Sequence, residues 1–95
     1  MVTCSRQFHH LEDLRDYINN TLCQNEQLEV DAFPLSERVL QRGGQPCGVF
    51  YCLRGPRNVT LTAIWDASTD SVMFYGPRGE RLSTTQLISG PQLIQ

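Results

Sequence analysis

Arginine supplies every positively charged side chain of this 95-residue sequence at pH 7, because it has eight arginines and no lysine. A guanidinium group is planar, forms paired hydrogen bonds with carboxylates and phosphates, and stacks on aromatic rings. Four of the arginines surround two expected turns that share the tripeptide Gly-Pro-Arg: Arg54, Arg57, Arg78 and Arg81. This pattern predicts a docking site for an acidic protein segment, a phosphorylated peptide or a nucleic-acid backbone. In the alternative interpretation, these arginines only keep two turns polar.

Four cysteines leave three interpretations open, namely reduced thiols, disulfides or zinc ligands: Cys4, Cys23, Cys47 and Cys52. Cys47 and Cys52 are five positions apart in an expected strand, where such residues point to opposite faces. The paired Cys-x2-Cys spacing of common zinc sites is absent from the sequence. His9 and His10 are adjacent and would diverge by about 100° on a helix. We therefore expect neither a metal site nor a cofactor.

The sequence contains no recognisable catalytic motif. It lacks the G-x-x-x-x-G-K-[ST] phosphate loop, the G-x-G-x-x-G fingerprint and the G-x-S-x-G nucleophile elbow. Glu12, Asp13 and Asp16 fit an ordinary solvated helix face rather than a pair of acid and base catalysts. A chain of this length also makes a deep pocket hard to build. We therefore expect a protein that is not an enzyme.

The composition describes one small globular domain. Hydrophobic residues make up 40% of the chain and charged residues 19%, with a net charge of −2, which argues against disorder. The longest apolar run, residues 49–53, is far shorter than the roughly 20 residues of a membrane span. Charged residues near the start argue against a secretory leader, so we expect an intracellular protein, cytoplasmic or nuclear. We assign residues 1–82 to a single α+β domain and the uncharged residues 83–95 to a flexible tail.

Hydrophobic spacing predicts one N-terminal amphipathic helix over residues 8–22. Its apolar stripe repeats at intervals of three and four residues: Phe8, Leu11, Leu14, Ile18 and Leu22. Residues 28–32 alternate apolar and polar side chains, which predicts a short strand. Residues 35–42 fit either a helical turn or a strand, and residues 43–46 form an expected loop.

From Gly48 onward, β-branched and aromatic residues predict an antiparallel meander. We expect strands over 48–53, 59–65 and 72–75, and the start of a fourth at 81–82. The expected fold class is therefore α+β, with the N-terminal helix packed on an antiparallel sheet of three to five strands. In a meander the turns after the first and third strands lie at one end of the sheet, which would gather the four arginines there.

Side-chain alternation divides this sheet into two faces. We expect the core face, with Leu53 opposite Val59 and Tyr51 opposite Leu61, to hold Val49, Tyr51, Leu53, Val59, Leu61, Ala63 and Trp65. In the strand at 72–75, either Val72 and Phe74 or Met73 and Tyr75 face the core, and we favour Val72 and Phe74. The second face would hold Phe50, Cys52, Thr60, Thr62, Ile64, Met73 and Tyr75, and it is more apolar than a solvated face should be. Either residues 35–40 or the tail cover it, or it is a partner or dimer surface.

Together these features predict a small intracellular protein-interaction module, an adaptor or regulator without catalysis. The partner would be another protein, bound through an acidic or phosphorylated segment. We expect the partner-binding residues to be Arg54, Arg57, Arg78, Arg81, Phe50, Ile64 and Tyr75. A homodimer through the second face is compatible with this function. The alternative is nucleic-acid or anionic-lipid binding through the arginine cluster, although the slightly acidic net charge disfavours nucleic acid.

Overall fold

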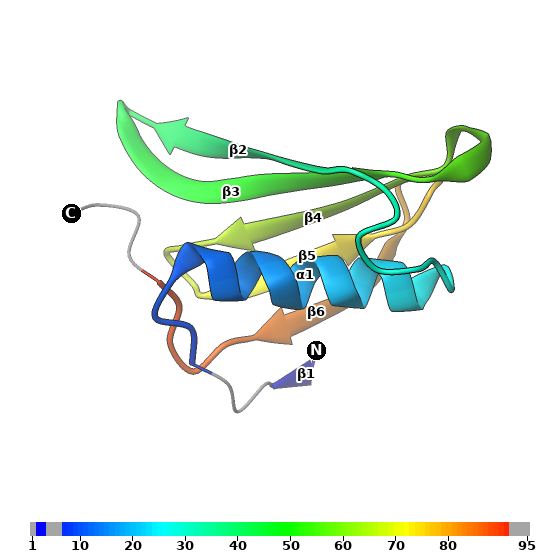
Figure 1. Cartoon of the computed structure of the whole chain (residues 1–95). Helices are drawn as coiled ribbons and strands as arrows, with labels where there is room; N and C mark the ends of the chain where they lie inside the picture. The colour runs from blue at the N-terminus through cyan, green and yellow to red at the C-terminus, as the bar shows by residue number, and fades with distance from the viewer. Residues whose placement is uncertain (1, 4–6, 92–95) are drawn as a thin grey trace.

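The computed structural model describes residues 2–3 and 7–91, in which one α-helix packs against a single sheet (Figure 1). The elements are β1 (Val2–Thr3), α1 (Leu11–Asn25), β2 (Leu35–Arg42), β3 (Gln45–Arg54), the 3-10 turn η1 (Pro56–Asn58), β4 (Thr60–Asp66), β5 (Ser71–Tyr75) and β6 (Arg81–Gln86). The sheet order is β1-β6-β5-β4-β3-β2. Strands β2 to β6 form an antiparallel meander, and β1 is parallel to β6. The expected α+β fold, a helix on an antiparallel meander, is confirmed.

Helix α1 begins at Leu11, three residues later than its apolar stripe. Phe8 is nevertheless buried, and its backbone N–H donates to the Ser89 carbonyl oxygen at 3.0 Å. This residue therefore contributes to the core from the segment before the helix and not from the helix itself. Glu12 and Asp13 lie in the first turn, where the helix dipole favours acids. The buried stripe continues with Leu14, Ile18, Leu22 and Cys23.

The segment between α1 and β2 differs from the expected strand at 28–32. It is a series of turns, in which the Leu28 N–H donates to the Cys23 carbonyl oxygen at 2.7 Å and Asp31 has a left-handed φ of 68°. The alternation of apolar residues was misleading because these turns must return the chain from the helix to the sheet. Residues 35–42 are a strand, and the loop after them is only the two-residue turn Gly43–Gly44.

The fourth expected strand is longer than residues 81–82, because β6 continues to Gln86. Residues 83–86 therefore belong to the sheet and not to a flexible tail, and Leu87 after them is buried in the core. The β-branched Thr85 lies opposite Val72, and its hydroxyl accepts a hydrogen bond from the Tyr17 hydroxyl at 3.2 Å. Residues 92–95 lie outside the described residues.

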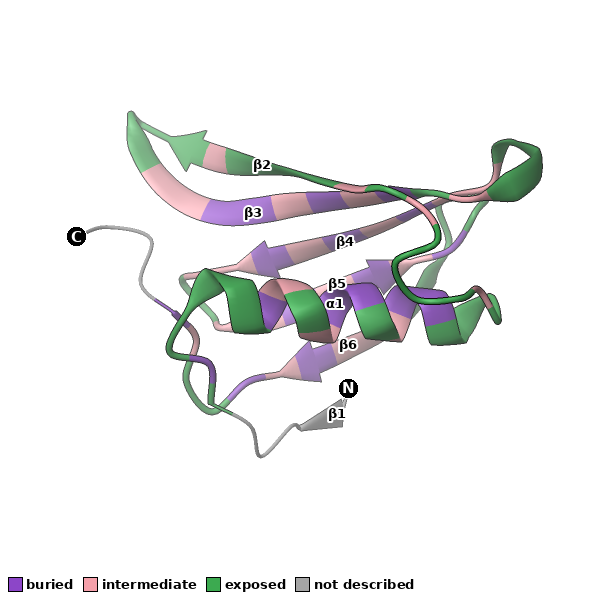
Figure 2. Ribbon diagram, viewed as in Figure 1, coloured by how far each residue is buried: buried purple, intermediate pink, exposed green. Residues whose placement is uncertain are grey.

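The core lies between α1 and one face of the sheet (Figure 2). Leu53 pairs with Leu61, and Tyr51 pairs with Ala63, so the register differs by two residues from the expected one. The reason is that the connection closes on Arg54 opposite Thr60. A two-residue shift keeps every side chain on its face. The expected core residues are accordingly buried, except for half-buried Val59: Val49, Tyr51, Leu53, Leu61, Ala63, Trp65, Val72 and Phe74.

Candidate functional site

The second face of the sheet is the candidate site, because α1 contacts β3 and β4 from the opposite side (Figure 1). Among the described residues, no helix covers this second face. Every side chain expected there is half-buried: Phe50, Cys52, Thr60, Thr62, Ile64, Met73 and Tyr75. We call this surface the open face.

Strand register arranges the open face in two rows that run across the strands. One row is Arg38, Phe50, Ile64, Met73 and Thr84, and the next is Ser36, Cys52, Thr62, Tyr75 and Arg81. The first row starts with an arginine on β2, and the second ends with an arginine on β6. The apolar residues lie between them. The open face therefore combines an apolar centre with cationic borders.

Each bordering arginine lies over an aromatic ring of the open face. The Cζ atom of Arg38 is 5.8 Å from the centroid of the Phe50 ring, and that of Arg81 is 5.9 Å from the centroid of the Tyr75 ring. Such cation–π contacts contribute about 0.5–1 kcal/mol at exposed sites. They hold the guanidinium groups against the sheet, where both groups can still donate hydrogen bonds to a ligand.

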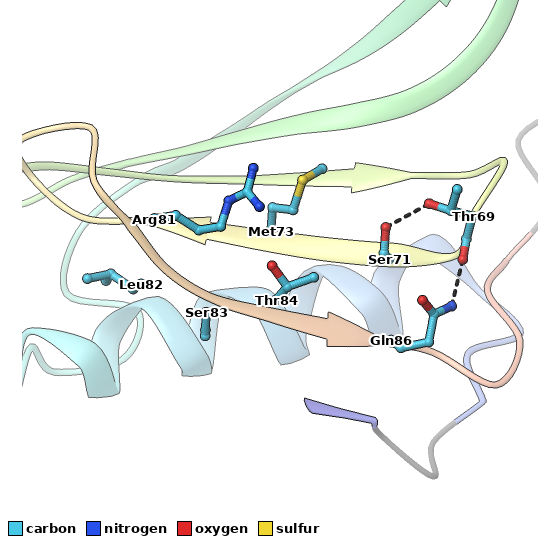
Figure 3. A pocket seen from close by; sticks show the side chains of 8 residues that line it. All are labelled: Thr69, Ser71, Met73, Arg81, Leu82, Ser83, Thr84 and Gln86. Atoms are coloured by element: carbon cyan, nitrogen blue, oxygen red, sulfur yellow. Dashed lines mark hydrogen bonds between the residues drawn. The ribbon is translucent and has the colours of Figure 1, made fainter. Parts of the chain in front are cut away.

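A shallow hollow of about 590 Å³ lies over β5 and β6 beside Arg81 (Figure 3). It is lined by Thr69, Ser71, Met73, Arg81, Leu82, Ser83, Thr84 and Gln86. Arg81 carries the only charge of this lining, and most of the remaining groups are hydroxyls. The Thr69 and Ser71 hydroxyls are 2.7 Å apart, and Gln86 Nε2 donates to the Thr69 carbonyl oxygen at 2.6 Å. Hydroxyls and a guanidinium without a carboxylate suit an anionic group.

The expected arginine cluster is distributed over two turns at one end of the sheet (Figure 1). Arg54 ends β3, Arg57 lies in η1 with a left-handed φ of 58°, Arg78 lies in the β5–β6 turn, and Arg81 begins β6. All four are exposed. Arg81 reaches the open face through Tyr75, whereas the side chains of the other three form no ion pair with any residue that the structure describes.

Two features of the candidate site are not singled out by the sequence pattern. Arg38 lies in the segment for which the sequence leaves helix and strand equally open, so its place on a sheet face could not be assigned. The hollow is lined partly by Thr84 and Gln86, which lie in the segment expected to be a tail. The strong β propensity of Thr84 and Thr85 was the signal that favoured a longer strand.

The buried thiol of Cys23, on α1, is not an activated nucleophile. Burial, helped by nearby Asp31, raises the pKa of the Cys23 thiol, which keeps it protonated. Cys47 and Cys52 are also free thiols, and Cys4 lies outside the described residues. At the sheet end away from the arginine turns, the Ser68 hydroxyl donates to Asp66 Oδ1 at 2.7 Å and holds the pKa of that carboxyl below its usual value. In the part of the chain that the structure describes, no three potential metal ligands come together.

The fold and site define a helix-covered β meander with an open, arginine-bordered face. Comparison of the chain with protein-family models, with curated proteins and with solved structures gives no significant match. None of the helices in residues 2–3 and 7–91 has the length and apolar character needed to cross a membrane.

Proposed function

We propose that this chain is a small, non-catalytic intracellular protein-interaction module, an adaptor or regulator, that binds a segment of a partner protein across its open face. The observation that carries the proposal is the half-buried apolar centre formed by Phe50, Ile64, Met73 and Tyr75. Contiguous apolar surface of this kind typically marks an interaction site. Arg38 and Arg81 border this centre, so the partner must supply both apolar and anionic groups.

The chemistry of the hollow supports an acidic or phosphorylated partner segment. An extended segment that places one apolar side chain over Ile64 could place an anionic side chain beside Arg81, in the hollow lined with hydroxyls. A guanidinium binds a carboxylate or phosphate through two parallel hydrogen bonds. Arg54, Arg57 and Arg78, at the adjoining end of the sheet, add positive charge that would speed the approach of such a segment.

Binding of synthetic peptides tests this proposal. We would titrate the protein with fluorescent peptides that combine leucines with aspartates or phosphoserines, and with the same peptides carrying lysines instead. Ile64→Asp should abolish binding of the anionic peptides because it places a carboxylate in the apolar centre. The double reversal Arg57→Glu with Arg78→Glu should also weaken binding. The loss of affinity should be larger at low salt than at high salt, because salt screens the charges.

A matched control is Val30→Asp, which introduces the same charge at an apolar residue that is 42% exposed, in the turns before β2. It should bind like the wild type. Circular dichroism would establish that each variant is folded. Equal binding by the wild type, Ile64→Asp and the double reversal would contradict the proposal, as would equal binding of the lysine peptides.

A second candidate function is the binding of nucleic acid or anionic lipid through the arginines. The observation that favours it is the presence of two aromatic rings, Phe50 and Tyr75, on an open sheet face, because unpaired bases stack on such rings. Titration with single-stranded RNA, DNA and anionic vesicles at low and physiological salt distinguishes the candidates. Binding of nucleic acid with loss of affinity in Phe50→Ala would favour this second function over the first.

A further inference from the structure

Strand β2 is an open edge of the sheet. It pairs with β3 on one side and with no strand of the described residues on the other. It is eight residues long, and six of these residues are exposed. The other edge of the meander is partly covered, because β1 pairs with β6 at Thr85 and Gln86. A long edge strand presents a row of backbone donors and acceptors that another strand can pair with.

The backbone groups of β2 that point away from β3 can be assigned. Gly43 and Gly44 have φ values of 59° and 80° and form a two-residue hairpin turn between Arg42 and Gln45, which are paired. In such a hairpin the flanking pair exchanges hydrogen bonds, so Arg42 directs its N–H and C=O toward β3.

Alternation along β2 then directs the backbone groups of Leu35, Glu37, Val39 and Gln41 outward. Two observations agree with this assignment. Gln41 lies opposite Pro46, which has no N–H to donate. The Leu35 carbonyl oxygen accepts a hydrogen bond from the Arg15 guanidinium at 3.0 Å, outside the ladder of the sheet. The free backbone groups are therefore those of Glu37, Val39 and Gln41.

The side chains of β2 permit a self-complementary register. With Val39 on a two-fold axis perpendicular to the sheet, Glu37 of one copy faces Gln41 of the other, and Arg38 faces Leu40. Each of the pairs formed by Val39, Glu37 and Gln41 would exchange both of its backbone hydrogen bonds. Moving the axis to Glu37 would place two carboxylates opposite each other, which is unfavourable. Backbone direction therefore allows the register centred on Val39, and charge disfavours the one centred on Glu37.

Apolar surface gathers at the same axis. The side chain of Val39 is 47% exposed and that of Leu11 is 36% exposed, and both line a hollow of about 220 Å³ between α1 and β2. The ion pair of Arg15 with Glu37, at 3.8 Å, borders this hollow. In the two-fold arrangement, both α1 helices lie on the same side of the joined sheet, and Val39 contacts its own symmetry mate.

We infer that two copies of this chain pair through their β2 edges, antiparallel and centred on Val39, to form a continuous sheet. This interface is formed by the edge of the sheet and does not rest on the proposed function, although Arg38 takes part in both surfaces. It leaves both open faces accessible on the same side of the dimer. A dimer of this kind would present two copies of the binding site to one partner.

The oligomeric state and amide exchange test this inference together. Light scattering over a wide range of concentrations should show the wild type passing from monomer to dimer. Hydrogen exchange should show the amides of Glu37, Val39 and Gln41 gaining protection as the dimer forms. A strict monomer at the highest concentration would overturn the inference, and so would a dimer in which these three amides remain unprotected.

Two variants should remove the dimer for different reasons. Val39→Pro deletes an outward N–H that the monomer does not use, and Val39→Lys places two ammonium groups at the axis. Each should weaken self-association by at least about tenfold, which corresponds to 1.4 kcal/mol. Leu82→Lys is the matched control, because Leu82 is equally exposed, at 45%, but lies on β6.

Circular dichroism would identify a variant that fails to fold. If Val39→Pro unfolds, Val39→Lys decides the question. Retention of the dimer by a folded Val39→Lys variant would overturn the inference. Loss of the dimer in Leu82→Lys, but not in the Val39 variants, would assign dimerisation to the β6 margin of the sheet. That result would also overturn the inference.

Discussion

The guanidinium of Arg81 lies over the ring of Tyr75, its partner across β5 and β6, with 5.9 Å between the Cζ atom and the ring centroid. Arg38 and Phe50 repeat this relationship across β2 and β3 at 5.8 Å. The two pairs enclose the apolar centre of the open face from opposite strands. Because each ring orients its arginine, the cationic groups are positioned before any ligand arrives, which lowers the entropy cost of binding.

Replacing Arg81 with lysine should weaken the binding of anionic peptides by about tenfold, or 1.4 kcal/mol, even though the charge is kept. Lysine binds as a point charge and cannot form the two parallel hydrogen bonds of a guanidinium. Fluorescence anisotropy with a phosphoserine peptide measures the loss. Arg42→Lys, at the end of β2, is the control and should bind like the wild type. Equal affinities for both variants would argue that net charge alone attracts the peptide.

The two faces of β4 should respond differently to truncation. Leu61→Ala removes a fully buried side chain and should cost about 2–5 kcal/mol of unfolding free energy. Ile64→Ala, three residues along, removes a half-buried side chain from the open face and should cost less than about 1.5 kcal/mol. Urea unfolding followed by the fluorescence of Trp65 gives both values. Similar losses for the two variants would mean that another layer covers the open face.

Tyr51→Phe should leave the stability at neutral pH unchanged or increase it by up to about 1 kcal/mol. The Tyr51 side chain is fully buried, and its hydroxyl has no hydrogen-bond partner among the described residues, so removing the hydroxyl relieves a desolvation cost. Thermal unfolding at pH 7 measures the difference. A loss of more than 1 kcal/mol would indicate a partner for this hydroxyl.

The same tyrosine should make the fold sensitive to alkali. Burial, with a smaller contribution from the charge of Glu37, raises the pKa of Tyr51 far above its usual value. When folding raises the pKa of a group, the free energy of unfolding is highest below the unfolded-state pKa, which is about 10 for tyrosine. It then decreases as the pH rises toward the folded-state pKa. Stability should therefore fall above about pH 10 in the wild type and in the control Tyr75→Phe, but less in Tyr51→Phe.

Two glycines should differ in their tolerance of a methyl group. A Cβ atom at Gly48 would overlap the Trp65 carbonyl oxygen, which is backbone of the neighbouring strand and cannot move away. At Gly76 it would meet the flexible carboxylate of Glu80 at 2.7 Å. Gly48→Ala should thus cost about 2 kcal/mol or more, and Gly76→Ala less than about 1 kcal/mol, by chemical unfolding. The reverse order would contradict the close packing of β3 against β4.

The faces of the sheet were predictable from the sequence, but the register was not. Strand residues alternate with a period of two, so the inward direction of Tyr51 and Ala63 follows from the sequence pattern. For β5 the pattern allows either Phe74 or Tyr75 to point inward, because both alternating sets are apolar. The pairing depends on how many residues the connection between Arg54 and Thr60 consumes, and the left-handed conformations of Arg57 and Asn58 decide that locally. The assignment of faces was nevertheless correct, because the register between β3 and β4 was wrong by two residues, an even number.

The candidate site was predictable only in part. Phe50, Ile64 and Tyr75 follow from alternation, and the shared end of the two arginine turns follows from meander topology. Arg38 and the hollow depend on β2 and the second half of β6, which tertiary pairing stabilises more than local preference does. Ser36, Glu37 and Arg38 carry little strand propensity, and pairing with β3 keeps them extended.

The bridge between Gln7 and Ser89 joins two segments that lie far apart in the sequence, at the margin of the sheet where β1 pairs with β6. Closing so long a loop costs conformational entropy before the contact can stabilise the fold. This margin should therefore be the last part of the sheet to assemble, after the consecutive hairpins that link β2 to β6.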